Sequence, residues 1–506
     1  MVRVRFAPSP TGALHIGGVR TALYNFLLAR KTGGTMILRI EDTDQSRFVP
    51  GAEEFILKSL AWTGIKIDEG VGIGGPYAPY RQSERKDIYK KYAAQLIGAG
   101  HAYYAFDTEE EVNVLRDRLK ASGGASQQYD SASRMQMKNS LTLGADEVQQ
   151  KIQAGEPFVI RAKIPINEEV SLDDLIRGRV TVSSSQLDDK VLMKSDGMPT
   201  YHLANVVDDY LMQITHVIRG EEWLPSAPLH VLLYRFFGWE NNRPQFAHLP
   251  LLLKPDGNGK LSKRDADKMG FPIFPMSWQD PETGELSAGY KESGYLPEAL
   301  INFLAFLGWN PGTEQEIFSI DQLIEAFTLE RIGKAGAKFD IQKAQWFNQQ
   351  YLKAKSDEEL SVFLLSDLKR ENISCTPEKA ARVCHAMKER ITFPQDIWLH
   401  GQFFFNAPQK FDEAVMAKKW NHESISVLTV FKNALANIET IKANEAKALL
   451  DGVAASLAIG TGKILQALRV VLAGGASGPD LMLTIEIIGP KETSKRIETA
   501  LQIFGS

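Results

Sequence analysis

A loop near the start of the chain, residues 8–18, combines proline, glycine and histidine in an order suited to holding phosphate. Alternating apolar residues over 2–6 predict a strand before this loop, and apolar residues at helical spacing predict a helix over 19–30. Glycine lets a ligand approach the backbone, and the N-terminus of a helix favours phosphate. His15 could donate hydrogen bonds to phosphate oxygens, although a purely structural histidine explains these residues equally well.

A second loop, 260–264, carries the cations Lys260, Lys263 and Arg264 behind the glycine-containing turn 256–259. Three positive charges on a mobile loop would suit a clamp that closes on a polyphosphate. Taken alone, this segment is better interpreted as a solvated basic loop.

Two further glycine-rich segments match phosphate-binding loops only superficially. Residues 70–75 fit the pattern GxGxxG, but prolines follow them where an apolar helix is required, so we predict a plain loop. Residues 460–463 resemble the end of a nucleotide-binding loop, but Ile464 stands where a serine or threonine would have to hold Mg²⁺. We predict a turn between two helices there.

The composition narrows the class of protein. At 506 residues the chain is long enough for about three domains, and its 44% hydrophobic and 24% charged residues exclude a disordered, collagen-like or coiled-coil chain. A net charge of -4 excludes a globally basic nucleic-acid coat, so a nucleic acid would have to meet local basic faces. Cys375 and Cys384 are too few for a disulfide scaffold and wrongly spaced for a zinc knuckle, which favours a reducing compartment.

The sequence holds no signal for a membrane or for export. No apolar run approaches 18 residues, so we predict no membrane span. The first residues contain neither an apolar signal core nor a transit segment. We therefore expect a cytoplasmic protein whose chain starts at its true beginning.

The order of the predicted elements indicates the fold class. A strand over 36–40 and a helix over 53–62 follow the first strand and helix, an order typical of a parallel α/β sheet. A low-complexity stretch at 121–133 indicates an insertion, after which α/β elements return over 201–237. Beyond about residue 330 the pattern is almost purely helical. The signals for helix starts there are Ser356 with Glu359, and Thr376 before Pro377.

Together the two loops resemble the HIGH and KMSKS signatures of class I aminoacyl-tRNA synthetases, and longer matches resemble the bacterial-type glutamyl-tRNA synthetases within that class. The segments that carry this resemblance are 5–12, 15–18, 39–44, 199–209, 218–223 and 260–264. Gly18 replaces the final histidine of HIGH, and Leu261 and Arg264 replace two residues of KMSKS, while both lysines remain. The resemblance runs from residue 3 to the end of the chain and is weakest at 105–155 and beyond 350.

The resemblance implies an α/β Rossmann-like catalytic core with an inserted α+β acceptor-binding domain, followed by all-α C-terminal domains. The expected divisions are 1–85 with 190–312 for the split catalytic domain, 86–189 for the inserted acceptor-stem-binding domain, 313–375 for a helical stem-contact domain and 376–506 for an all-helical anticodon-binding domain.

A glutamate site needs a partner for each of two carboxylates and for an ammonium group. Arginine suits carboxylates, because its guanidinium fork binds them bidentately and stays charged. The resemblance assigns the γ-carboxylate to Arg5, the α-carboxylate to Arg219 and the ammonium to Glu41. The full predicted set is Arg5, Ala7, Ser9, Glu41, Tyr201, Asn205 and Arg219, of which Tyr201 and Asn205 would share one helix face. Without the resemblance, ordinary structural roles would be favoured for each residue.

The resemblance also implies ATP with Mg²⁺ and a reaction without an enzyme nucleophile. The glutamate carboxylate would attack the α-phosphate, and the terminal adenosine hydroxyl of tRNA would then attack the acyl carbon, so catalysis would come from positioning and charge stabilisation. The predicted catalytic residues are His15, Lys260 and Lys263. The predicted ATP site comprises Thr11, Gly12, His15, Gly17, Gly18, Glu222, Leu261, Ser262, Lys263 and Arg264. Because residues 101–107 hold no cysteine, we expect no structural zinc, and no protein ligands to a metal.

A basic segment and the helical region would bind the tRNA. Arg331, Lys334, Lys338 and Lys343 give residues 331–343 a local charge of about +3, which suits an RNA backbone. The expected partners are L-glutamate and tRNA(Glu); whether tRNA(Gln) is also charged stays open, and we expect a monomer.

The rivals come from the same and from other classes. Glutaminyl-tRNA synthetase shares the motifs but carries a β-barrel appendage, and a truncated paralogue that glutamylates a modified tRNA base lacks the helical region. A non-catalytic tRNA-binding module would not need His15, Glu41 and Lys263 together, and a small HIGH-type nucleotidyltransferase would be far shorter.

Overall fold

The computed structural model describes residues 1–121 and 128–505. The chain forms two compact units, the first comprising Met1–Ser293 with Pro297–Ile341 and the second Gly294–Leu296 with Gln342–Ser506. The finer division into four domains stays a prediction. Part of the predicted low-complexity insertion, 122–127, lies outside the described residues. Within the described residues, no helix is long and apolar enough to cross a membrane.

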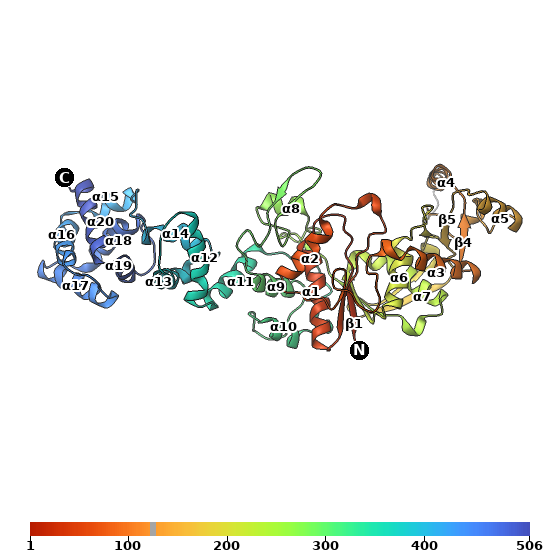
Figure 1. Cartoon of the computed structure of the whole chain (residues 1–506), viewed down its shortest axis with the longest axis horizontal. Coiled ribbons are helices and arrows are strands. Elements are labelled where there is room, and N and C mark those ends of the chain that lie inside the picture. Colours follow the sequence, from red (N-terminus) through yellow and green to blue (C-terminus); the bar gives the residue numbers. More distant parts are fainter. Residues whose placement is uncertain (122–127, 506) are drawn as a thin grey trace. The chain divides into compact units, whose positions relative to one another are not determined.

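The first unit begins with the predicted strand–helix alternation. β1 (Arg3–Phe6), β2 (Thr35–Leu38) and β3 (Glu69–Gly70) form a parallel sheet in that order. α1 (Ile16–Lys31) packs on β1 and β2, and α2 (Ala52–Trp62) follows β2 (Figure 1). The prediction of parallel α/β order is therefore confirmed. α1 begins three residues earlier than predicted, because the side chain of His15 caps it.

A second sheet has the strand order β7-β6-β10-β9. Its members are β6 (Glu169–Asp174), β7 (Gly178–Ser183), β9 (His216–Gly220) and β10 (Gln245–Leu249). β6, β10 and β9 run parallel, and β7 forms a hairpin with β6. The backbone N–H of Thr215 donates to the carbonyl of Arg3 at 2.9 Å, so β9 adjoins β1 and the carboxyl ends of both sheets open on one edge.

The helices over 201–237 also lie where the sequence places them. α6 (Tyr201–Leu211) and α7 (Ala227–Phe236) pack together, and β5 (Val159–Ala162) precedes them in the chain. β6 and β7 fall within the segment predicted as an insertion, yet β6 pairs with β10. A third sheet, β4-β5-β8, is antiparallel.

The remaining elements of the first unit complete its frame. They are α3 (Lys86–Gly98), β4 (Ala102–Ala105), α4 (Glu109–Ala121), α5 (Ala145–Gln153), β8 (Val191–Met193), β11 (Leu252–Leu253), α8 (Lys263–Met269), β12 (Trp278–Gln279), β13 (Leu286–Ser287), α9 (Pro297–Phe306), α10 (Ile320–Ala326) and β14 (Ala337–Lys338). The segment 70–75 leaves β3 through turns without entering a helix, which confirms the plain loop.

The second unit is helical in all of its described elements. They are α11 (Ile341–Ala354), α12 (Asp357–Arg370), α13 (Pro377–Met387), α14 (Asp396–Gly401), α15 (Glu413–Lys419), α16 (His422–Ala436), α17 (Ala443–Ser456), α18 (Leu465–Ala473), α19 (Leu481–Ile488) and α20 (Pro490–Phe504) (Figure 1). The predicted capping box Ser356–Glu359 and the cap at Thr376 are present. Residues 460–463 form the predicted turn between α17 and α18.

Candidate functional site

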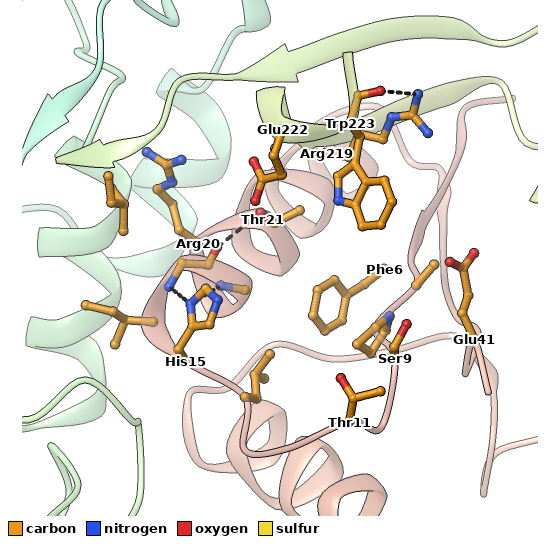
Figure 2. Close-up of a pocket in the computed structure, with 18 of the residues that line it drawn as sticks. Phe6, Ser9, Thr11, His15, Arg20, Thr21, Glu41, Arg219, Glu222 and Trp223 are labelled. Atoms are coloured by element: carbon orange, nitrogen blue, oxygen red, sulfur yellow. Dashed lines mark hydrogen bonds between the residues drawn. The ribbon is translucent and has the colours of Figure 1, made fainter. Parts of the chain in front are cut away.

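A cavity of about 440 Å³ opens at the shared edge of the two parallel sheets. It gathers residues from the loop 7–18, from the ends of β1, β2 and β9, from α6 and from the loop before α8. The predicted residues that line it are Arg5, Ala7, Ser9, Thr11, Gly12, His15, Gly17, Gly18, Glu41, Tyr201, Asn205, Arg219, Glu222, Lys260 and Leu261. Figure 2 shows Arg219 and Glu41 toward one end of the cavity and His15 and Arg20 toward the other.

The His15 end is built around the start of α1. Nδ1 of His15 accepts hydrogen bonds from the backbone N–H groups of Gly17 at 3.0 Å and Gly18 at 3.3 Å. A Cβ at Gly17 would lie 2.7 Å from His15 Cε1, and one at Gly18 would lie 2.4 Å from Leu14 Cδ1, so a side chain at either position would displace its neighbour. Enclosure by the surrounding protein lowers the pKa of His15, and the Lys260 ammonium lowers it further. The neutral ring therefore carries its proton on Nε2.

The basic loop contributes only its first two residues to the cavity. Lys260 Nζ lies 3.1 Å from Glu222 Oε1, and Leu261 is buried against the site. Ser262 does not line the cavity, because it caps α8 in a capping box with Asp265. Lys263 and Arg264 also stand outside the lining: Lys263 Nζ faces Glu285 Oε2 at 3.4 Å, and Arg264 is exposed.

At the other end, buried ion pairs hold two of the predicted glutamate ligands. Arg5 Nε donates to Asp209 Oδ1 at 3.1 Å, and Arg39 Nη1 donates to the same oxygen at 2.7 Å. Arg39 Nη2 also donates to Glu41 Oε1 at 3.0 Å, and so does Asn205 Nδ2. Among the described residues, Glu41 Oε2 and the two Nη atoms of Arg5 have no hydrogen-bond partner. These atoms are the ones left for a ligand.

Arg219 is held by three neighbours from different elements. Its Nε donates to His248 Nε2 at 3.0 Å, its Nη1 to the hydroxyl of Tyr201 at 2.6 Å and its Nη2 to the carbonyl of Trp223 at 3.4 Å. Burial raises the pKa of Tyr201 to about 12, so its hydroxyl stays protonated. The Tyr201 and Trp223 rings are 4.6 Å apart, and Trp223 forms one wall of the cavity (Figure 2).

No sequence motif assigns a role to Arg39, Asp209, Trp223 or His248. The first three lie within the segments that carry the family resemblance, so the signal was present but could not show which side chains meet. His248 lies on β10 outside those segments, and no signal in the sequence singles it out.

The predicted tRNA-binding cations fall in both compact units. Arg331, Lys334 and Lys338 are exposed in the first unit. Lys343 belongs to the second unit, where its Nζ lies 3.9 Å from the centre of the Trp346 ring. Throughout the residues that the structure describes, no group of three or more His, Cys, Asp or Glu could hold a metal ion.

Comparison with known proteins gives this site its context. The family "tRNA synthetases class I (E and Q), catalytic domain" matches residues 1–346, and the family "Anticodon binding domain" matches residues 349–501. The chain is 61% identical to the glutamate–tRNA ligase of Cytophaga hutchinsonii, an alignment that covers 99% of this chain and 97% of that protein. It is 54% identical to the enzyme of the same name from Bacteroides fragilis, with 99% of each chain covered.

A solved structure agrees with these matches. The crystal structure of a glutamate–tRNA ligase from Elizabethkingia meningosepticum, in complex with its amino acid, superposes with a TM-score of 0.96 and 49% identity and covers 99% of both chains. These findings confirm the resemblance, a class I catalytic region and a helical anticodon-binding region, and the parallel α/β order of the first unit agrees with a Rossmann-like core. Both of these relatives and the solved structure carry the glutamate name. The chain belongs to the glutamate–tRNA ligase family of class I tRNA synthetases.

Proposed function

We propose that this chain activates L-glutamate with ATP and transfers it to the 3′-terminal adenosine of tRNA(Glu), releasing AMP and diphosphate. The observation that carries the proposal is the cavity with two chemically different ends. Two arginines and a glutamate with free donor and acceptor atoms lie at one end, and a glycine-lined helix start lies at the other. A small zwitterion with a second carboxylate and a polyphosphate are the ligands that fit these ends.

At the amino-acid end, Arg5 takes the γ-carboxylate, Arg219 the α-carboxylate and Glu41 the ammonium. Arg219 has five N–H donors and uses three on the protein, so two remain for one carboxylate. Asn205 and Arg39 both occupy Oε1 of Glu41, which leaves Oε2 for the ammonium. The other predicted contacts are the backbone at Ala7 and the hydroxyls of Ser9 and Tyr201.

At the phosphate end, the Nε2–H of His15 donates to an ATP phosphate oxygen. The backbone at Thr11, Gly12, Gly17 and Gly18 admits the nucleotide closely, and the N-terminus of α1 stabilises its negative charge. Lys260 and Glu222 lie at this end as an ion pair, beside Leu261. Mg²⁺ enters with ATP as part of the substrate, and this proposal requires no protein ligand for it.

The chemistry then needs placement of the reactants and no covalent intermediate on the protein. The α-carboxylate attacks the α-phosphorus of ATP, and diphosphate leaves. The adenosine hydroxyl of tRNA attacks the acyl carbon of the adenylate, and AMP leaves. Holding the reactants in line and neutralising the phosphate charge are the contributions of the chain.

For tRNA, we propose that Arg331, Lys334, Lys338 and Lys343 bind the backbone of a stem, with 86–189 at the acceptor end and the helical region at the anticodon. Exposed cations that neutralise phosphates release counterions, so affinity should fall steeply with salt. A cytoplasmic monomer is the expected form.

Charging two purified transcripts tests the overall reaction. Glutamate on tRNA(Glu) alone would identify a discriminating enzyme, and glutamate on both tRNA(Glu) and tRNA(Gln) a non-discriminating one. Glutamine on tRNA(Gln), or no charging of either transcript, would overturn the proposal.

Lys263→Ala tests the second signature loop. We expect adenylate formation to slow by about 10² to 10³, as for loss of one preorganised donor to a developing charge, measured as ATP–diphosphate exchange with tRNA present. For Lys263 to reach a phosphate, its ammonium must leave Glu285. Lys268→Ala, an exposed cation on the same helix, is the matched control. Equal rates for both variants would remove Lys263 from the reaction.

A further inference from the structure

A buried row of side chains leads to Arg219 across three parallel strands. Asp174 ends β6, His248 lies on β10 and Arg219 lies on β9, where His248 and Arg219 are direct partners in the register. Asp174 Oδ2 and His248 Nδ1 are 2.6 Å apart, and His248 Nε2 is 3.0 Å from Arg219 Nε. The side chains of Asp174 and His248 have no solvent exposure. The proposed mechanism gives this pair no role.

The chemistry of the row fixes the direction of each hydrogen bond. The Nε–H of arginine can only donate, so His248 Nε2 must be the lone-pair nitrogen. The proton of the neutral ring must then be on Nδ1, which donates to Asp174 Oδ2. Oδ1 of Asp174 accepts from the backbone N–H groups of Ile176 at 3.0 Å, Arg177 at 2.8 Å and His248 at 3.3 Å. The carboxylate therefore cannot rotate without losing these bonds.

The same geometry keeps the imidazole neutral. Burial lowers the pKa of His248. A second ring proton would also place an Nε2–H against the Nε–H of Arg219. Only one tautomer of the ring is compatible with the position of the arginine.

We propose that Asp174 and His248 form a positioning dyad for Arg219. By fixing the tautomer, the dyad holds the Nε edge of the guanidinium, while the Tyr201 hydroxyl holds Nη1 and the Trp223 carbonyl holds Nη2. The two remaining N–H groups are thereby aimed at the substrate carboxylate. This inference rests on the proposed function, in which Arg219 binds glutamate. Asp174 and His248 are positioning residues, because neither lines the cavity.

Asp174→Asn inverts the tautomer. The backbone bonds retain the amide oxygen at the Oδ1 position, so the new NH₂ faces His248 Nδ1 and forces the ring proton onto Nε2. The Nε2–H of His248 and the Nε–H of Arg219 are then both donors and face each other without an acceptor. We expect the KM for glutamate to rise roughly tenfold to a hundredfold, the usual effect of a buried donor left without its acceptor, with the KM for ATP unchanged. Asp173→Asn, the same change at the exposed neighbouring residue, is the control and should leave both values unchanged.

Two variants at His248 separate its two hydrogen bonds. His248→Gln can place an amide oxygen near the Nε2 position and still accept from Arg219, so its KM for glutamate should stay within a few-fold of wild type. His248→Asn places its amide near Nδ1 and can only reach Asp174, so it should resemble Asp174→Asn. Similar KM values for the two His248 variants would overturn the dyad.

A spectroscopic readout keeps the test independent of folding of the variants. In the ¹⁵N spectrum of histidine-labelled wild-type protein, the signal that disappears in His248→Gln identifies His248, and it should show protonated Nδ1. Protonated Nε2 in the wild type would overturn the inference. Arg219→Ala separates the two proposals: if it leaves the KM for glutamate unchanged, the proposed function fails. If it raises that KM while Asp174→Asn and His248→Asn do not, only the dyad fails.

Discussion

The two compact units are stabilised by different interiors. The first buries charged side chains beside its cavity, among them Arg5, Arg39, Glu41 and Asp209, none more than 9% exposed. Of the described residues of the second unit, Asp367 and Arg496 are the only buried charged ones. Its core around α16 to α20 consists of side chains such as Phe431, Leu468 and Ile485.

The difference reflects what each interior has to do. Burying ion pairs is often no more stabilising than packing apolar side chains of similar volume, whereas removing one partner is strongly destabilising. A chain gains little stability from such pairs, but it gains side chains whose charge and direction are fixed before a ligand arrives. The first unit contains the cavity, and the second holds its helices together by apolar packing.

The largest expected effect is the loss of the shared carboxylate. Asp209→Ala leaves Arg5 and Arg39 without their common partner, and we expect the free energy of unfolding of the first unit to fall by roughly 3–5 kcal/mol, with glutamate charging lost. Hydrogen exchange read by mass spectrometry reports the two units separately. Glu54→Ala, which removes an exposed pair with Lys58, is the control and should change little. If Asp209→Ala were equally mild, the buried pairs would not distinguish the units.

The next largest effect is the loss of stability of the first unit when the pH is lowered. Burial lowers the pKa of His202 to about 4, and this ring faces His230 at 3.3 Å, with Lys190, Asp188 and Arg219 as the nearby charges. In the unfolded chain His202 binds a proton near pH 6.5, whereas in the folded chain it does so only near pH 4. The stability that the neutral ring contributes is therefore fully present above pH 6.5 and is lost as the pH falls toward 4. At about 1.4 kcal/mol per pKa unit, it amounts to roughly 3 kcal/mol.

Urea unfolding of the first unit at pH 7 and pH 4.5, in wild type and in His202→Gln, measures this contribution. The variant should lose less stability on acidification than the wild type does. An identical loss would show that His202 does not titrate in this way. The three histidines of the second unit are all exposed, so it offers no buried imidazole to titrate in the same way.

The smallest effect concerns an exposed ion pair of the second unit. Lys463 and Glu423 are 3.0 Å apart, with side chains 62% and 43% exposed. A double-mutant cycle with alanine should give a coupling below about 1 kcal/mol that shrinks further in salt, because water screens the pair. A coupling as large as the effect of Asp209→Ala would contradict the comparison between the units.

The sequence predicts what depends on neighbours along the chain. Helix starts at Ser356 and Thr376, the strand predicted over 2–6 and the helix over 53–62 follow from local spacing and caps, and the structure confirms them. Contacts between residues far apart in the sequence cannot be predicted in this way. Arg5 and Asp209 are 204 residues apart, and no periodicity could show that they meet.

The same limit applies to the site. Local motifs and the resemblance marked most of the residues that line the cavity. The partners that hold them come from strand order, which the sequence leaves open: β6 lies beside β10, so Asp174 reaches His248. Lys263 shows the opposite case, since its motif marks it for the site while its ammonium faces Glu285 and the residue does not line the cavity.

The cap of α1 has a consequence for how this sequence can change over time. Because the His15 ring occupies the space that a side chain at residue 17 would need, the two positions cannot drift independently. A side chain at 17 would require the His15 ring to move away from the backbone N–H groups that it caps. A substitution at residue 17 would therefore also displace the Nε2–H donor of residue 15.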